Sequence, residues 1–318
     1  YDSALGKKKA ELKTALHKII GKADVLDYGS GAGKTWSGFV QTDVDDEGYY
    51  VDMYSPNRVK ANGNSAGSGM NIEHSFAKSW WGGTKNQAYK DIQQLRPSNS
   101  KANSSKGSWP MAIVDGKTTY DNGVIKVGKS SSRPGGEITA WEPSDQYKGD
   151  FARAYFYIAT CYEDVFPRFG GEMTAGNSYP GYKDWVIDLL LKWHRNDNVD
   201  SKEIDRNEAV QKKQHNRNPF IDYPELVEYI WGNKKGIAFN LPTSIGKTDM
   251  NTIHITTKEE SIIITTSVPV HVFLYNTYGT LIQSQNGQGE IHIPANRSGI
   301  YILKIQNDKY IITRKIKL

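Results

Sequence analysis

The chain is organised around residues 71–83, which read Asn71-Ile72-Glu73-His74-Ser75-Phe76-Ala77-Lys78-Ser79-Trp80-Trp81-Gly82-Gly83 and set a carboxylate beside an imidazole. A second polar run, residues 91–106, is rich in amides and hydroxyls. Carboxylate and amide oxygens are hard ligands that suit Mg²⁺, which usually takes one or two protein ligands and retains several waters. An imidazole beside such an ion can take a proton from water near neutral pH. These groups together would suffice to hydrolyse a phosphodiester.

A Glu-His dipeptide by itself also fits an ordinary surface pair, but here it belongs to a longer pattern. The pair Glu73-His74 is followed by Asp91, Leu95 and Pro97 in the spacing Asp-x-x-x-Leu-x-Pro, and then by Asn103. This pattern resembles the signature of the bacterial endonuclease I family, whose members are secreted or periplasmic nucleases with a ββα-metal site. The sequence around residues 193–194, 206–207 and 216–222 resembles the same family, so the resemblance covers most of residues 1–235.

The resemblance implies a role for each matching residue of the site. Glu73 and Asn103 would hold the metal ion, and His74 would be the general base that deprotonates the attacking water. The ion is expected to be Mg²⁺, with Ca²⁺ or Mn²⁺ as alternatives. It would neutralise charge on the phosphate and stabilise the leaving 3′ oxygen, so that cleavage leaves a 5′ phosphate.

Further side chains in and after the second run are candidates for contact with the phosphate. Lys106 is assigned to the catalytic set beside the imidazole, and Gln94, Arg96 and Arg133 are assigned to substrate binding. Gln94 stands where many members of that family have His or Asn. Ala77 stands where many have Pro, which loosens the turn after the base. These two departures keep open a nuclease fold that binds without cutting.

The local structure of the site residues is less regular than the motif. Neighbours on a regular strand point to opposite faces, yet Glu73 and His74 must serve one site. We therefore expect the strand to end or bulge at this pair, as bulges often do beside active sites. The segment around Asn103 is weakly helical, because Ser, Asn and Gly prefer caps and turns. If it is a helix, tertiary packing or the metal must hold it.

Two motifs upstream invite a functional reading that their details disfavour. Residues 29–35 resemble a phosphate-binding loop, but Tyr28 replaces the first glycine, and the strand- or turn-like run 36–39 follows where a helix should begin. A flexible glycine loop without ATP binding is expected there. Residues 43–48 resemble the start of a calcium loop, but Tyr54 takes the twelfth position, where a bidentate Glu is needed. A solvated acidic turn is favoured, with a weak calcium site as the alternative.

The composition changes after about residue 240, which predicts two domains. Residues 1–240 form an endonuclease I-like domain, with an amphipathic helix over 3–20, aromatic stripes at helical spacing, and a capping box at Asp200–Glu203. Over residues 248–318, β-branched residues alternate with polar ones between turn signals, which indicates a small immunoglobulin-like β-sandwich. The fold class is therefore α+β, a helix-rich ββα-metal nuclease domain followed by an all-β domain.

The last part of the chain, residues 299–317, resembles the C-terminal sorting domain of the type IX secretion system. That resemblance implies the type IX secretion machinery as a partner. It also implies a protein that is secreted or held at the outer-membrane surface of a Gram-negative bacterium. The chain begins at Tyr1 without a signal sequence, which favours a mature or trimmed form.

Composition sets limits without identifying a partner. The 318 residues carry 40 basic and 35 acidic side chains, and the resulting net charge of +5 is too mild to indicate nucleic-acid binding by itself. Cys161 is the single cysteine, which excludes an intramolecular disulfide and predicts a buried thiol. No run approaches the ~20 apolar residues of a membrane helix, so no integral membrane segment is expected. A monomer is the simplest expectation.

Three functions follow from these patterns. The leading one is a secreted, metal-dependent, sequence-nonspecific endonuclease acting on DNA, RNA or both. The second belongs to a different class, a cell-surface binding or adhesion protein whose β-rich tail and aromatic residues grip a glycan or a partner. The third is a nucleic-acid binder that does not cleave. Digestion of nucleic acid with and without EDTA separates them.

Overall fold

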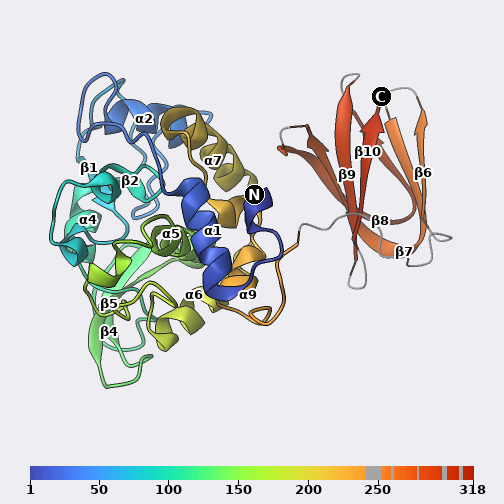
Figure 1. Cartoon of the computed structure of the whole chain (residues 1–318). Coiled ribbons are helices and arrows are strands. Elements are labelled where there is room, and N and C mark those ends of the chain that lie inside the picture. Colours follow the sequence, from blue (N-terminus) through green and yellow to red (C-terminus); the bar gives the residue numbers. More distant parts are fainter. Residues whose placement is uncertain (241–252, 259–260, 278, 296–298, 308–310) are drawn as a thin grey trace. The chain divides into compact units, whose positions relative to one another are not determined.

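The computed structural model describes residues 1–240, 253–258, 261–277, 279–295, 299–307 and 311–318. The chain divides into two compact units, Tyr1–Phe239 and Asn240–Leu318 (Figure 1). The first unit combines helices with small sheets and the second contains strands, which confirms the expected α+β class. The expected start of the second domain at residue 248 lies outside the described residues. Within the described part of the chain, no helix is long and apolar enough to cross a membrane.

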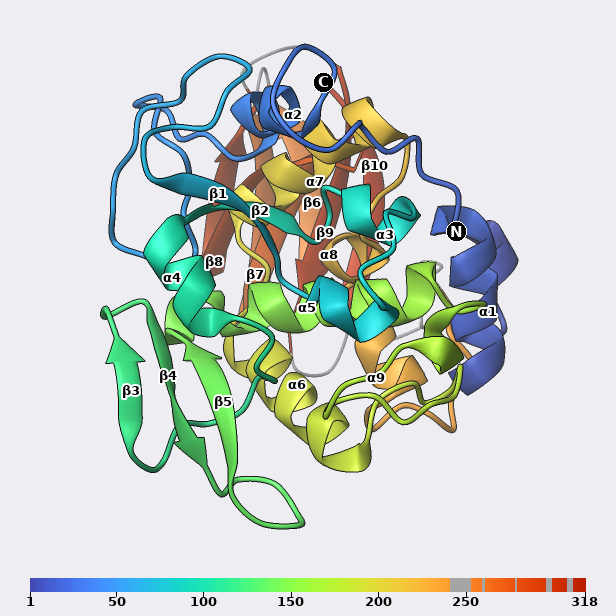
Figure 2. The ribbon, with the colours of Figure 1, turned by 90° about the vertical axis from the view of Figure 1, so that its left-hand side faces the viewer.

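The first unit is built around α5 (Lys148–Cys161), which is buried along almost its whole length. Its sequence places apolar or small side chains at most positions, so that neighbours can cover it on every side. It contacts α1 (Lys9–Ile20), α6 (Asp184–Asn196) and α8 (Pro219–Asp222), and Figure 2 shows it crossing the middle of this unit. Cys161 at its end is buried, as expected.

One longer helix and several short helical elements complete the helical part of the first unit. α7 (Ser201–Gln214) begins with the predicted capping box, in which the Asp200 and Glu203 side chains and backbones bond reciprocally. The shorter helical elements are η1 (Asp2–Ala4), η2 (Lys78–Trp81), α3 (Gln87–Lys90), α4 (Ser100–Lys106), η3 (Asp145–Tyr147), η4 (Phe166–Arg168) and α9 (Leu226–Ile230).

Two small antiparallel sheets accompany these helices. β1 (Met70–His74) pairs with β2 (Leu95–Asn99), and the chain passes from β2 directly into α4, which contacts both strands. The two strands and this helix form the expected ββα arrangement, seen together in Figure 2. A separate sheet has the order β3–β4–β5, with bounds Thr118–Asp121, Ile125–Ser130 and Ile138–Pro143.

The N-terminal region differs from the sequence-based expectation in two places. The first long helix, α1, starts several residues later than expected, after η1 and a turn. The run 36–39 was expected to be strand- or turn-like, but it lies inside a helix, α2 (Thr35–Thr42). Trp36 and Phe39 lie three residues apart and are both buried in a cluster that includes Val210 of α7. The helix therefore depends on packing against distant segments, which overrides weak local propensity.

The close packing around Gly38 explains why α2 contains a glycine in its interior. A Cβ at Gly38 would lie 2.6 Å from Cδ1 of Ile92 and 2.8 Å from Cδ1 of Leu26. Only a residue without a side chain allows the helix to approach these two neighbours so closely. The glycine that weakens the helical pattern in the sequence is thus required by the close packing of α2.

The second unit is one curled antiparallel sheet in the order β10–β9–β7–β6, with β8 also pairing with β7. The first part of β7 pairs with β6 and its last part pairs with β9, with a register irregularity against β8 between Thr266 and Val270. The curl encloses a core of aliphatic side chains such as Ile264, Val272 and Leu303. The strands are β6 (Ile253–Lys258), β7 (Ser261–Asn276), β8 (Leu281–Pro294), β9 (Ile300–Gln306) and β10 (Ile311–Lys317).

A buried histidine of α6 should make the stability of the first unit depend on pH. His194 is 7% exposed and packs edge-on against Phe156, and burial lowers the pKa of His194 to about 4. Between pH 6.5 and 4 the unfolded state binds this proton more readily than the folded state, so the free energy of unfolding falls as the pH falls. His194→Gln should remove up to about 3 kcal/mol of this acid-induced loss, measured by urea unfolding at pH 7 and pH 4.5. Equal acid-induced losses in the two proteins would contradict the prediction.

Candidate active site

A cavity of about 500 Å³ opens where β1 ends and is bordered by both residues of the Glu-His pair. Segments far apart in the sequence line it: the glycine loop, β1 with the turn after it, and α4 with the residues that follow. Asn103 of α4 lines the same cavity as Glu73 and His74. The structure thus brings together the three residues to which the resemblance assigns the metal and the base.

The strand was expected to end or bulge at the Glu-His pair, and it ends there without a bulge. β1 keeps a regular antiparallel register with β2, in which Glu73 lies opposite Arg96 and His74 opposite Leu95. β1 ends at His74. Because the cavity lies at the end of the strand, both residues border it without any irregularity in the ladder.

Glu73 is buried together with a lysine of α4. It is 6% exposed, and its Oε1 lies 2.6 Å from Nζ of Lys106, which is itself 1% exposed. The ammonium also donates to the backbone oxygens of His74 and Gly107, both at 3.3 Å. Burial raises the pKa of Glu73, and the charge of Lys106 opposes that rise. Lys106 therefore neutralises a buried carboxylate, and it is not among the residues that line the cavity.

The imidazole of His74 is held in one tautomer. Its Nε2 lies 3.0 Å from the backbone oxygen of Tyr89. A carbonyl only accepts, so Nε2 carries the hydrogen and Nδ1 is the unprotonated nitrogen of the neutral ring. Among the described residues, none forms a hydrogen bond with Nδ1. Burial lowers the pKa of His74 to about 4. The ring is therefore neutral at neutral pH and can accept a proton at Nδ1.

Aromatic side chains fix the orientation of this imidazole. Tyr28 stacks on His74 with ring centroids 5.6 Å apart and an interplanar angle of 19°, and Tyr89 and Trp81 lie 4.6 and 5.9 Å away. Tyr28 also lines the cavity. Sequence reasoning missed Tyr28, since its only signal was its place before the glycine loop. The structure shows that this loop brings Tyr28 to the ring of His74.

The helix that carries Asn103 forms despite its polar sequence, because its N-terminus is capped. The Asn99 side chain accepts hydrogen bonds from the backbone N–H groups of Lys101 and Ala102, at 3.0 and 3.2 Å. The N–H of Asn99 donates to the buried carboxylate of Asp52 at 2.9 Å. The cap and the buried side chain of Ala102 hold the helix. Asn103 is thereby presented to the cavity on a short regular element.

Gln94, which the sequence analysis assigned to substrate binding, anchors the segment that follows His74. The Gln94 amide donates to the backbone oxygen of Ala88 at 2.7 Å and accepts from the N–H of Phe76 at 3.3 Å. Its backbone oxygen accepts from both the N–H and the hydroxyl of Ser75. Gln94 is fully buried and its polar groups are engaged by the protein. It positions the turn after His74.

Asp91, which begins the second motif, is a buried hydrogen-bond centre. Its carboxylate accepts from the hydroxyls of Tyr157 and Tyr162 at 2.7 Å each and from Nε2 of Gln214 at 2.6 Å. These partners come from the end of α5 and from α7. Asp91 therefore ties the loop before β2 to the helical core.

The two arginines assigned to substrate binding do not line the cavity. Arg96 is 7% exposed and lies 3.8 Å from the buried carboxylate of Asp43. Arg133 donates to the backbone oxygen of Pro134 and lies 3.8 Å from Glu172. Each guanidinium group therefore lies near a carboxylate of the protein. The cation that does border the cavity is Lys78, which is exposed and makes no ion pair with a described residue. Sequence reasoning named Lys78 in the motif without giving it a role.

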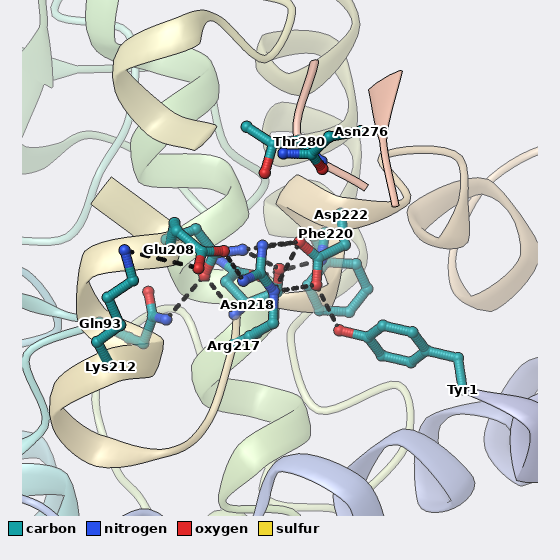
Figure 3. Close-up of polar contacts among 11 residues, drawn as sticks. Tyr1, Gln93, Glu208, Lys212, Arg217, Asn218, Phe220, Asp222, Asn276 and Thr280 are labelled. Carbon is teal, nitrogen blue, oxygen red and sulfur yellow. Dashed lines mark hydrogen bonds and ion pairs between the residues drawn. The ribbon is translucent and has the colours of Figure 1, made fainter. Parts of the chain in front are cut away.

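Residues 216–222, whose sequence resembles the same family, form a polar cluster (Figure 3). Asn207 accepts hydrogen bonds from the N–H of Asn218 at 2.8 Å and from the amide of Gln93 at 3.0 Å, and it donates to Asp222 at 3.0 Å. Arg217 pairs with the same Asp222 at 2.7 Å. Through the bond between Gln93 and Asn207, the cluster holds the loop before β2 and therefore has a structural role.

The donor set at the cavity fits a hard divalent ion. Glu73 offers a carboxylate, and the Asn103 amide makes no hydrogen bond to a described residue, so its oxygen is available. Two oxygen ligands completed by water are a usual arrangement for Mg²⁺. Among the described residues, no group of three or more His, Cys, Asp and Glu is placed to hold a metal. The pair Glu73 and Asn103 is the set that this cavity provides.

Comparisons with known proteins agree with these features. A family model described as Endonuclease I matches residues 8–225, and one described as a secretion system C-terminal sorting domain matches residues 249–318. The chain is 38% identical over 241 residues to an extracellular ribonuclease of Bacillus amyloliquefaciens, covering 73% of this chain and 77% of that protein. It is 35% identical over 240 residues to an extracellular ribonuclease of Bacillus subtilis, with the same two shares.

Proposed function

The chain belongs to the endonuclease I family, and we propose that this secreted nuclease hydrolyses phosphodiester bonds with the aid of a divalent ion held by Glu73 and Asn103. The observation that carries the proposal is the meeting of these two residues with His74 at one cavity. The sorting domain at residues 249–318 implies export by the type IX secretion machinery, and the protein is secreted or held at the cell surface.

In the proposed reaction, His74 accepts the proton of the attacking water at Nδ1. The hydrogen bond from Nε2 to Tyr89 and the stacked ring of Tyr28 keep Nδ1 directed and unprotonated. Lys78 at the edge of the cavity attracts the phosphate. A divalent ion, when bound, would supply positive charge to the phosphate and the leaving oxygen. Cleavage is proposed to leave a 5′ phosphate.

The substrate is proposed to be RNA, DNA or both, without sequence preference. The names of the two Bacillus relatives support RNA among the substrates. The cavity offers a lysine, an amide and hydroxyl groups, which suit the phosphodiester common to both polymers. The ion is proposed to be Mg²⁺, with Mn²⁺ or Ca²⁺ as replacements.

Removing divalent ions should abolish cleavage. The purified chain would be incubated with supercoiled plasmid and with a structured RNA, in buffer containing Mg²⁺ or excess EDTA. We expect nicking and digestion with Mg²⁺ and neither with EDTA, because the phosphate would then lack its main source of charge neutralisation. Re-addition of Mg²⁺, Mn²⁺ or Ca²⁺ separately ranks the ions, and ligation of the products tests for 5′ phosphates. Undiminished cleavage in EDTA would refute metal dependence, and no cleavage under any condition would favour a non-cleaving binder.

A further inference from the structure

We propose that Trp109 is a stacking platform for one unpaired nucleobase of the substrate, next to the phosphate that lies in the cavity. The inference rests on the proposed function and specifies how the polymer is held there. It predicts a substrate whose bases are accessible, namely a single strand or a frayed end. Trp109 would thus supply an aromatic contact with the base, which neither the motif residues nor the proposed metal ligands provide.

Trp109 is the exception among the tryptophans of the chain. Of the eight, six are less than 10% exposed and Trp185 is half-buried, whereas Trp109 is 46% exposed. Burial of an indole is strongly favourable, so a Trp held in water beside a core with many aromatic residues needs an explanation. Single exposed apolar residues are ordinary, as Ile19 in α1 illustrates. Exposure alone therefore does not make Trp109 a binding residue, and its position relative to the cavity must be considered.

Trp109 lies directly beside the lining of the cavity, at the edge that we call its rim. It follows Gly107 and Ser108, which both line the cavity. A Cβ added to Gly107 would lie 4.0 Å from Nε1 of Trp109, so the indole extends alongside this lining residue. Gly107 has φ of +51°, which turns the chain sharply after α4. The Trp109 side chain thereby lies beside the site instead of continuing the helix.

The backbone that carries Trp109 is fixed on both sides. Its N–H donates to the oxygen of Lys106 at 3.3 Å, and the hydroxyl of Ser108 accepts from that of Ser79 at 2.9 Å. The next residue, Pro110, is buried, and its oxygen accepts from the N–H of Trp141 at 2.9 Å. A backbone held in this way loses little conformational freedom when a base stacks on the indole.

The chemistry of the rim suits one nucleotide of a polymer. Lys78, exposed at the cavity, matches a phosphate, and Trp109 matches the flat apolar face of the adjoining base. Stacking on an aromatic side chain accepts every base, which agrees with cleavage without sequence preference. A base inside a duplex is already stacked and paired, so it must be released before it can reach the indole.

Binding of short oligonucleotides tests the proposal. The non-cleaving variant His74→Ala would be titrated with a fluorescent 12-mer of thymidine and with the same 12-mer carrying abasic sugars at its central positions. We expect Trp109→Ala in this background to bind the intact 12-mer about tenfold more weakly and the abasic 12-mer equally well. Trp109→Phe should retain most of the affinity, and Ile19→Ala, which also removes an exposed apolar side chain, should change nothing.

Two results would overturn the proposal: unchanged affinity of Trp109→Ala for the intact 12-mer, or equal weakening for both 12-mers. The second result would indicate a contact with the backbone instead of a base. Cleavage of the intact 12-mer by the otherwise unmodified chain, measured in parallel, distinguishes failure of this inference from failure of the proposed nuclease chemistry. In that chain, Trp109→Ala should raise KM for the single strand with little change in kcat.

Discussion

Replacing His74 by alanine is expected to lower the rate of phosphodiester cleavage by about 10²–10⁴-fold, because a positioned general base typically contributes a factor of this size. The imidazole is the group at the cavity that can accept a proton from water at neutral pH, with Nδ1 free and Nε2–H bound to Tyr89. Glu73 and Asn103 are untouched by the change, so binding of the divalent ion should persist. Steady-state cleavage of a single-stranded substrate at saturating Mg²⁺ measures the effect.

The matched control for this variant is His194→Ala. His194 is also buried, and burial also lowers the pKa of His194 to about 4, but it lies in α6 and does not line the cavity. Its replacement should lower the midpoint of thermal unfolding and leave kcat nearly unchanged. His74→Ala should show the reverse, and added imidazole should restore part of its activity. Retained turnover in His74→Ala would remove the base from the mechanism.

Replacing Lys106 by methionine is expected to destabilise the first unit by about 3–5 kcal/mol in the absence of divalent ions. The change removes the ammonium 2.6 Å from Oε1 of Glu73 and keeps most of the aliphatic stem. The carboxylate, which is 6% exposed, would then be buried without a neutralising charge. Urea unfolding in EDTA measures the loss. Lys101→Met on the same helix removes an exposed lysine and should cost no more than about 0.5 kcal/mol.

Three further measurements identify the cause of that loss. The double variant Lys106→Met with Glu73→Gln carries no buried charge and should regain much of the stability. Without Lys106, the pKa of Glu73 should rise further above its usual value. A carboxyl whose folded-state pKa is raised loses stability as the pH increases, so the deficit should be larger at pH 8 than at pH 5. Added Mg²⁺ should raise the stability of Lys106→Met most, that of the parent chain less, and that of the double variant least. A deficit independent of both pH and Glu73 would mean that lost packing is responsible.

Part of this fold follows from short local sequence patterns and could be predicted from them. The capping box at Asp200 signals the start of α7, and the alternation of β-branched and polar residues signals the strands of the second unit. These patterns recur within a few residues, so the sequence shows them directly. α2 was not predictable in this way. Trp36 and Phe39 become helical because they pack on residues from distant segments, Ile92 and Val210 among them.

In the site, too, the sequence motif identified some features and only the structure showed the others. The motif identified Glu73, His74 and Asn103, and the structure places all three at one cavity. The motif gave no reason to expect that the side-chain amide of Gln94 would bond to the backbone at Phe76, in the turn after His74, and at Ala88. A side-chain amide can serve a ligand or the protein equally well in chemical terms. Only the position of the neighbouring backbone decides which.

The sequence by itself determined the chemical groups of this protein: a carboxylate, an imidazole and an amide in the order of a known nuclease family. It also determined a C-terminal part in which β-branched residues alternate with polar ones, as in strands. The tertiary structure decided their states. It set Tyr28 on the ring of His74, committed Lys106 to Glu73, and left Trp109 in water at the rim. The physical reason is that pKa, charge pairing and exposure depend on which atoms exclude water from a group. In this chain those atoms come from segments that meet only when it folds.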